Sequence, residues 1–337
     1  MKNRIVKLSL FFFWIANPCV AGYFQRLVIS SDGTPYLNVY TRQGSLNIMK
    51  YNSQHKALDV YFPIPDQEKC HINYSALDPT GNKLAYFGYC KLTNIISSET
   101  SVQGFYHLAV VDIKNKRVII DFDHGGNLFS FSPKGDAIVY AEDIPGEPGS
   151  PAPPGYQGSV WLYNFNTKAK KKIDVNLRLI RDINWSEHDG NIYITNNQYV
   201  YLYDVKKGKG DIVPYKGIYF SPDGKYYCDY EMASSNIYRT SDNQKMIDWK
   251  KTINERSNWN DSSMIFQFWS KKLNAGIFSV RGGINVIFDI NEGKVIGEFN
   301  GDIIGTNPIG TLVAVHPPGK DNQGKVEILN LLDLIKK

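Results

Sequence analysis

The sequence predicts an all-β chain folded as a β-propeller of about seven four-stranded blades, with six or eight blades as the alternatives. The first observation is a turn motif that recurs along the chain, in its fullest form Phe220-Ser221-Pro222-Asp223-Gly224-Lys225. The second is that short strand-like segments, separated by polar turns, follow each copy. Repeats of about 40–50 residues built in this way are typical of propellers, and a β-sandwich accounts less well for the recurring turn.

The motif is typical of a tight turn between two antiparallel strands. Pro222 presets φ to about −65° at the first central position, Asp223 bonds its own backbone, and Gly224 accepts a positive φ. Phe220 and Tyr226 on either side are strand formers. The other copies are Asp78-Pro79-Thr80-Gly81, Ser132-Pro133-Lys134-Gly135, Ser186-Glu187-His188-Asp189-Gly190 and Asn307-Pro308-Ile309-Gly310, with a shortened Ser31-Asp32-Gly33 and a degenerate Ser270-Lys271-Lys272-Leu273-Asn274.

The segments after each turn are rich in β-branched and aromatic residues, so we expect them to be the later strands of each blade. In chain order they are residues 35–40, 45–51 and 57–62; 83–90, 106–113 and 118–122; 136–141, 159–165 and 171–175; 191–195, 199–205 and 212–215; 236–239 and 246–249; 276–280, 284–290 and 295–299; and 311–316 and 325–329. The last unit lacks a convincing fourth strand. We expect residues 22–29 or residues 331–335 to supply it, because an open ring leaves sheet edges free.

The repeat resembles a known family. Phe220-Ser221-Pro222-Asp223-Gly224-Lys225, together with third strands that contain Tyr203-Asp204-Val205 and Phe288-Asp289-Ile290, looks like the WD-repeat-like propeller repeat of the bacterial translocation protein TolB and of prolyl-oligopeptidase-type proteins. The resemblance covers nearly all of residues 23–337 and implies a propeller. TolB carries a further N-terminal domain and the oligopeptidases carry a hydrolase domain, for which the repeats leave no room, so the resemblance implies no activity.

Residues 1–21 are expected to be a secretory signal peptide, which leaves residues 22–337 as a single propeller domain. Three basic residues lie at the start, a short apolar run follows over residues 8–16, and Cys19-Val20-Ala21 resembles a cleavage site. An uncleaved N-terminal anchor is the alternative, but the apolar run is short for a bilayer and no other candidate span follows. We therefore expect an exported protein, located in the periplasm or outside the cell.

The charge of the chain is nearly balanced after export. Removal of the signal lowers the formal net charge from +5 to +2, because residues 1–21 hold three basic and no acidic residues. Nucleic acid is therefore not implied as a partner. Basic residues gather at three turns between third and fourth strands, namely Lys114, Lys116 and Arg117; Lys168, Lys170, Lys171 and Lys172; and Lys206, Lys207 and Lys209. They either meet anionic headgroups or an acidic protein, or prevent pairing at the outer edges of the blades.

Three cysteines remain after removal of the signal. Cys70 and Cys90 flank the turn at residues 78–81 almost symmetrically, so we expect them to face each other across one hairpin, where the Cα separation permits a disulfide. An exported protein allows this bond to form. Two buried free thiols are the alternative. Cys228 is left without a partner and is expected to be buried on a strand.

Two long connections between second and third strands are the expected docking surface for a partner. They span residues 91–104 and 142–158, and they should rise from the same face of neighbouring blades. The second is rich in proline and should be extended and semi-rigid. The expected contact residues are Ile95, Ile96, Glu142, Asp143, Glu147 and Tyr156. The partner would be a protein or cell-envelope component that meets a monomeric propeller; the alternative is that both loops are solvated insertions without a role.

The sequence contains no pattern that points to catalysis or to a cofactor. No Gly-x-Ser-x-Gly elbow, Walker loop or His-Glu-x-x-His motif is present, and the six histidines fall at different repeat positions. We therefore name no catalytic residue, no metal site and no cofactor. The five tryptophans after the signal are expected to fill blade interfaces. The alternative function is a propeller enzyme, a lyase or a hydrolase, that acts on a saccharide or peptide in the central channel.

Overall fold

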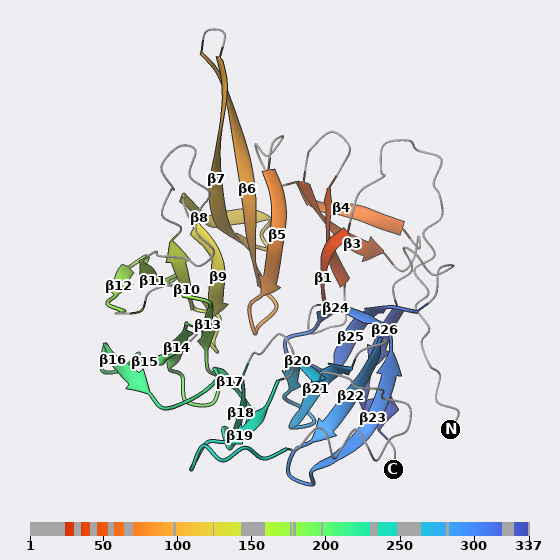
Figure 1. The fold of residues 1–337 in the computed structure, drawn as a ribbon. Coiled ribbons are helices and arrows are strands. Elements are labelled where there is room, and N and C mark those ends of the chain that lie inside the picture. Colours follow the sequence, from red (N-terminus) through yellow and green to blue (C-terminus); the bar gives the residue numbers. More distant parts are fainter. Residues whose placement is uncertain are drawn as a thin grey trace.

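The computed structural model describes residues 24–29, 35–40, 46–52, 57–63, 70–96, 99–123, 125–142, 159–175, 177, 180–196, 198–229, 235–247, 264–280, 283–318 and 327–335. Nearly all of the regular structure in this part of the chain is β-strand, arranged as a β-propeller (Figure 1). The strands form seven small antiparallel sheets. The predicted fold class is therefore confirmed.

The strands follow one another within each sheet in chain order. The first sheet contains β1 (Phe24–Ile29), β2 (Pro35–Tyr40), β3 (Leu46–Asn52) and β4 (Ala57–Pro63). The second contains β5 (Cys70–Leu77), β6 (Lys83–Ile96), β7 (Glu99–Asp112) and β8 (Arg117–Asp123). The third contains β9 (Gly125–Phe131), β10 (Ala137–Glu142), β11 (Val160–Asn164) and β12 (Lys170–Ile173).

The fourth sheet contains β13 (Asp182–Trp185), β14 (Ile192–Thr195), β15 (Val200–Asp204) and β16 (Lys209–Val213). The fifth contains β17 (Tyr219–Phe220), β18 (Tyr226–Cys228) and β19 (Ile237–Arg239). The sixth contains β20 (Met264–Ser270), β21 (Ala275–Val280), β22 (Ile284–Asp289) and β23 (Lys294–Asn300). The seventh contains β24 (Asp302–Thr306), β25 (Leu312–His316) and β26 (Glu327–Asn330), and the 3₁₀ helix η2 (Leu331–Leu334) follows it.

The recurring turn joins the first and second strands of a sheet, as predicted. Its first residue is buried, and in four copies the side-chain oxygen of that residue accepts a hydrogen bond from the backbone N–H five residues later. These pairs are Asp78 with Lys83, Ser132 with Ala137, Ser221 with Tyr226, and Asn307 with Leu312, at 2.7–3.0 Å. The degenerate copy also forms the expected turn, because it connects the paired residues Ser270 and Ala275 of β20 and β21.

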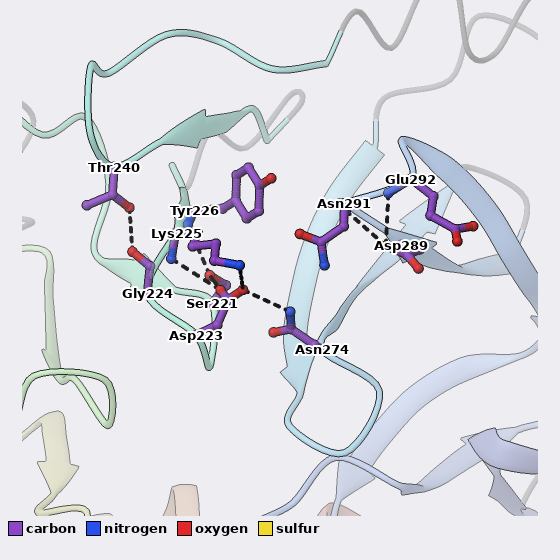
Figure 2. A network of polar contacts seen from close by, with 10 residues as sticks. All are labelled: Ser221, Asp223, Gly224, Lys225, Tyr226, Thr240, Asn274, Asp289, Asn291 and Glu292. Carbon is purple, nitrogen blue, oxygen red and sulfur yellow. Dashed lines mark hydrogen bonds and ion pairs between the residues drawn. The ribbon is translucent and has the colours of Figure 1, made fainter.

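The turn of the fifth sheet is also tied to its neighbour, as Figure 2 shows. Asp223 accepts hydrogen bonds from the Ser221 hydroxyl (2.7 Å), from the backbone N–H of Lys225 (3.2 Å) and from the side-chain amide of Asn274 (3.0 Å), which lies in the turn of the sixth sheet. Burial acts to raise the pKa of Asp223, but these donors hold it below its ordinary value. The motif therefore orders its own turn and links two blades.

The hydrophobic core lies between the blades. Among the described residues, five clusters each join two consecutive sheets, from the second and third to the sixth and seventh. Each interface can be illustrated by one pair of buried residues, one from each sheet. From the interface of the second and third sheets to that of the sixth and seventh, these pairs are Phe87 and Tyr140, Val139 and Ile194, Tyr193 and Tyr227, Cys228 and Phe278, and Ile277 and Val313. Consecutive residues of a second strand thus enter opposite interfaces, because successive side chains of a strand point to opposite faces of the sheet.

The ring closes differently from both expectations. β1 pairs with β2 in the first sheet and adds no fourth strand to the seventh. Instead β1 lies against both β24 and β5, with Ile29 fully buried. The C-terminal residues 331–335 form η2 and a single bridge from Ile335 to Gly297 in the sixth sheet. Closure at this point therefore comes from packing between first strands rather than from a sheet shared by the two ends of the chain.

The fifth sheet also departs from the predicted pattern. The sequence predicts its fourth strand over residues 246–249. Of this segment the structure describes residues 246 and 247, where the Met246 N–H donates to the Ile237 carbonyl at 2.8 Å beside a bridge from Lys245 to Tyr238, but these contacts form no full strand. The rest lies outside the described residues, as do residues 1–21, for which a signal peptide is predicted, and the shortened turn copy at residues 31–33. The other predicted strands agree with the structure to within a few residues, apart from the segment after residue 90.

Candidate functional site

The connection over residues 91–104 is a β-hairpin, and its prediction as a loop is wrong. β6 continues to Ile96 and β7 begins at Glu99, and the two strands pair in register up to Ile96 and Glu99. Figure 1 shows this hairpin rising beyond the rest of the second sheet. The reason is local, because the segment alternates β-branched residues such as Thr93, Ile95 and Val102 with polar ones, which favours strands over a loop.

We call the paired residues 91–96 and 99–104 the arm. β5 begins at Cys70, which pairs with Cys90, and β8 ends at Asp123, which pairs with His107. Beyond these points, the two strands of the arm pair only with each other among the described strands. The outer edge of each strand therefore presents backbone N–H and C=O groups that no described strand uses.

The structure places three of the six predicted contact residues. Ile95 and Ile96 lie near the tip of the arm, where they pair with Thr100 and Glu99. Glu142 is the last residue of β10 in the neighbouring sheet. Asp143, Glu147 and Tyr156 lie outside the described residues, as does most of the predicted loop over residues 142–158.

Glu142 is committed to contacts within its own sheet. Its carboxylate accepts a hydrogen bond from the Trp161 indole N–H at 2.6 Å and forms an ion pair with Lys170 at 2.7 Å. The Lys170 ammonium also lies 4.1 Å from the centre of the Trp161 ring, which is a cation–π distance. Glu142 thus anchors the start of the 142–158 segment, and its oxygens are less available to a partner than the sequence suggests.

The two cysteines of the second sheet are positioned as predicted. Cys70 and Cys90 are directly opposite each other in the pairing of β5 and β6. Such residues in an antiparallel pair have Cα atoms close enough for a disulfide. Cys228 is buried and unbonded, and burial raises the pKa of its thiol.

The opposite face of the propeller holds a cavity of about 270 Å³ at the mouth of the central channel. It is lined by first strands and first turns of five sheets, from the second to the sixth. Its walls include the aromatic residues Phe129, Phe131, Trp185, Tyr219, Phe220 and Trp269. Sequence reasoning assigns the tryptophans to blade interfaces. Trp185 does belong to the core between the third and fourth sheets, but it also lines the cavity.

Hydrogen bonds between sheets hold this cavity together. The backbone N–H of Trp185 donates to the Ser130 hydroxyl at 2.9 Å, and the Asn184 side-chain amide donates to the Ile218 carbonyl at 2.7 Å. Glu187 and Lys271 form an ion pair of 2.6 Å between the fourth and sixth sheets. These contacts join residues far apart in the sequence, so no local pattern predicts them.

Asp182 begins the strand that carries Trp185. Its carboxylate accepts hydrogen bonds from the Tyr219 hydroxyl of the next sheet and from the backbone N–H of Ile183. The residue keeps some exposed surface, but protein atoms enclose its carboxyl, and this burial raises the pKa of Asp182 to about 7. We therefore expect the interface between the fourth and fifth sheets to respond to pH near neutrality.

The cavity offers polar contacts but no cluster of acid–base groups. Glu187 is the one carboxylate among its lining residues and His188 the one imidazole, and Glu187 is paired with Lys271. No group of three or more His, Cys, Asp or Glu side chains able to hold a metal ion occurs among the described residues. The cavity suits the binding of a ligand better than acid–base chemistry.

The basic residues at the third-to-fourth turns lie at outer edges, as expected. β12 is the outermost strand of its sheet and exposes three consecutive lysines, Lys170, Lys171 and Lys172. Several basic side chains have acidic partners within their own turn, such as Lys207 with Asp204 at 2.8 Å. This arrangement agrees with the interpretation that lysines block pairing at the edges.

Among the residues described, no helix is both long and apolar enough to cross a membrane. No family model matches the chain, and no curated protein matches it either. The resemblance of the repeat to TolB-type propellers remains a prediction. The assignment of a function therefore depends on the arm and the cavity.

Proposed function

We propose that this chain is an exported, non-enzymatic β-propeller that binds a protein or cell-envelope partner through the face that carries the arm and the 142–158 segment. The observation that supports this most is the arm itself, two paired strands that extend beyond the sheet to which they belong. Export rests on the signal-like residues 1–21.

The sequence of the arm lacks the edge protection that β12 has. β12 blunts its edge with three exposed lysines. Residues 91–104 contain no proline and a single lysine, Lys91, at the base. Unprotected edges pair readily with another strand, and natural proteins usually avoid them unless the edge has a partner. An extended segment of a partner protein that adds as a further strand is the binding mode that this geometry favours.

The alternative of an enzyme in the central channel receives less support. The mouth of the channel is lined by aromatic rings and hydroxyl groups, and its one carboxylate is neutralised by Lys271. Neither a carboxylate pair nor a nucleophile beside a base occurs among the residues that line it.

Chemical crosslinking with mass spectrometry on intact cells tests the proposal. An arm-deletion variant joins Cys90 to Phe105, which are paired, through an Asn-Gly turn that preserves the register of the hairpin. The matched control places the same Asn-Gly turn at Ser97 and Ser98 and so keeps the arm. We expect the wild-type chain and the control to capture the same partner and the arm-deletion variant to lose it.

Amide hydrogen exchange then tests the binding mode on the purified pair. Added partner should slow exchange over residues 91–96 or 99–104, because a new strand would bond these backbone groups. A partner that the arm-deletion variant captures as well as the wild type would contradict the proposal, and so would capture of no partner by the wild type. A further variant with residues 144–157 cut to two residues measures the contribution of the second segment.

A further inference from the structure

The cavity lies on the opposite face from the arm. First-to-second turns line the cavity, whereas the arm connects a second strand to a third. Because consecutive strands are antiparallel, these two kinds of connection lie at opposite ends of the sheet. A ligand in the cavity would leave the arm free, so binding in the cavity is independent of the function proposed for the arm.

Two tryptophans provide fixed aromatic walls. The Trp185 indole N–H donates to the Gly190 carbonyl at 2.9 Å, and the Trp269 indole N–H donates to the Tyr219 carbonyl at 2.9 Å. Both polar atoms are thus used within the protein, which holds the rings in place. Trp185 is 7% exposed, so the half-buried Trp269 offers more of its ring surface for contact. Flat, preorganised aromatic surfaces bind ligands that present an apolar ring face.

A buried hydroxyl group in the cavity wall lacks a partner. Ser186 is 2% exposed, lines the cavity, and its hydroxyl oxygen makes no hydrogen bond. In the equivalent turns, Ser132 and Ser221 accept a bond from the N–H five residues later. In the fourth sheet that N–H, from Asn191, donates to Asp189 instead.

The cause is the conformation of this turn. It has the usual number of residues, because Trp185 pairs with Ile192 as Phe220 pairs with Tyr227, but its glycine of positive φ lies one position later. The Gly190 N–H bonds the carbonyl four residues back, whereas the Gly224 N–H bonds the carbonyl three residues back. In this conformation the serine hydroxyl does not take its usual capping role. An unpaired buried hydroxyl is unfavourable by itself, so a ligand hydroxyl that bonded to it would gain affinity.

The charges at the cavity balance each other. Glu187 and Lys271 pair at 2.6 Å, and both side chains are partly exposed at the mouth. A cationic ligand would compete with Lys271 for the carboxylate, and an anionic ligand would compete with Glu187 for the ammonium. A neutral ligand with hydroxyl groups leaves the ion pair intact. Its hydroxyl groups can still bond to the free lone pairs of the Glu187 carboxylate and to the free protons of the Lys271 ammonium.

We propose that this cavity binds a single neutral sugar ring. The ring's C–H face packs on the aromatic wall, and its hydroxyl groups bond to Ser186 and to the Glu187–Lys271 pair. The volume of about 270 Å³ lies just below the range of about 300–1,000 Å³ for drug-sized ligands, which suits one ring rather than an enclosed chain. The sugar is either free or the terminal unit of a longer glycan.

Saturation-transfer NMR with the purified full chain tests this site. The probes are the methyl glycosides of glucose, galactose, mannose and N-acetylglucosamine, with cyclohexanol, glucuronic acid and glucosamine for comparison. We expect at least one neutral glycoside to bind better than cyclohexanol and better than both charged sugars. A disaccharide that ends in the preferred sugar distinguishes the sources: it binds equally well if the site accepts a glycan terminus, and poorly if the site accepts free sugar.

The matched variants are Ser186→Ala and Ser270→Ala. Both serines are buried, both have an unpartnered hydroxyl and both begin a turn, but only Ser186 lines the cavity. Ser186→Ala should weaken glycoside binding by about five- to tenfold, the effect of one lost hydrogen bond, while Ser270→Ala leaves it unchanged. Equal thermal unfolding midpoints would show that both variants fold.

Three results of the sugar-binding experiments would overturn the proposal. The first is that no glycoside binds. The second is that cyclohexanol or a charged sugar binds as tightly as the best neutral glycoside. The third is that Ser186→Ala and Ser270→Ala change binding equally. A short peptide that binds in place of every sugar would also assign the cavity to another class of ligand.

Discussion

Five turn glycines have a positive φ, between 65° and 74°: Gly81, Gly135, Gly190, Gly224 and Gly310. The turn motif predicts this backbone conformation, since glycine accepts it without strain. The structure adds a second reason at some of these positions. A Cβ atom at Gly310 would lie 2.8 Å from the backbone of both Ser270 and Trp269 in the preceding turn, whereas one at Gly190 would meet nothing within 4 Å.

These two glycines allow a direct comparison. Gly190→Ala should destabilise the protein by about 1–2 kcal/mol, the strain of a positive φ alone. Gly310→Ala should destabilise it by about 1–3 kcal/mol more, because a methyl group would collide with backbone that cannot move away. Urea unfolding of both variants measures the difference. Equal losses of stability would show that the contact between turns is not tight.

At the scale of the element, the hairpin of β6 and β7 shows where sequence reasoning succeeds and fails. The repeat pattern predicts the strands and their pairing, but it ends the hairpin at residue 90 because other blades have short strands. The residues beyond it are strand formers that alternate with polar residues. Strand length depends on whether a partner strand is present, and here each long strand supplies the partner of the other.

In the same sheet, Cys70 and Cys90 are paired across β5 and β6. We therefore predict a disulfide between them. Peptide mapping without reductant should recover the two cysteines linked, and reduction should lower the free energy of unfolding by about 3 kcal/mol. The double variant Cys70→Ser with Cys90→Ser is the control and should not respond to reductant.

The hypothesis fails if both thiols can be alkylated in the unreduced, unfolded protein. Cys228 serves as an internal reference in this experiment. It is fully buried and burial raises the pKa of its thiol, so it should react with iodoacetamide only after unfolding.

At the scale of the whole molecule, the ring is held by contacts between first strands and by interface clusters. Asp182 lies at one such interface, where its carboxylate accepts a hydrogen bond from Tyr219. Burial raises the pKa of Asp182 from 3.8 to about 7. The folded state therefore binds a proton more tightly than the unfolded state, and stability should fall as the pH rises from about 4 to about 7.

Asp182→Asn should remove this dependence. The variant keeps an acceptor for Tyr219 but cannot ionise, so its stability relative to the wild type should increase with pH across this window. The shift corresponds to at most about 4 kcal/mol. Urea unfolding of both proteins between about pH 4 and pH 8 measures it. A stability difference that does not change with pH would exclude Asp182 as the titrating group.

The sequence by itself determined the propeller, the recurring turn and most of the strands. These features depend on neighbouring residues, because turn chemistry and the period-two alternation of side chains act within a few positions. It also placed Cys70 and Cys90 on facing strands of one hairpin, but their direct opposition depends on a register shift between Ile72 and Tyr74 that the turn spacing does not predict.

Only the tertiary structure decided how the ring closes, how far the arm extends, and which side chains meet at the channel. The Glu187–Lys271 pair and the aromatic wall join residues from blades far apart in the chain. The free hydroxyl of Ser186 accompanies a glycine of positive φ that lies one position later than in the other turns, and only the structure shows that this serine lines the cavity. Such features depend on how the blades are placed around the channel, and no local pattern in the sequence encodes that placement.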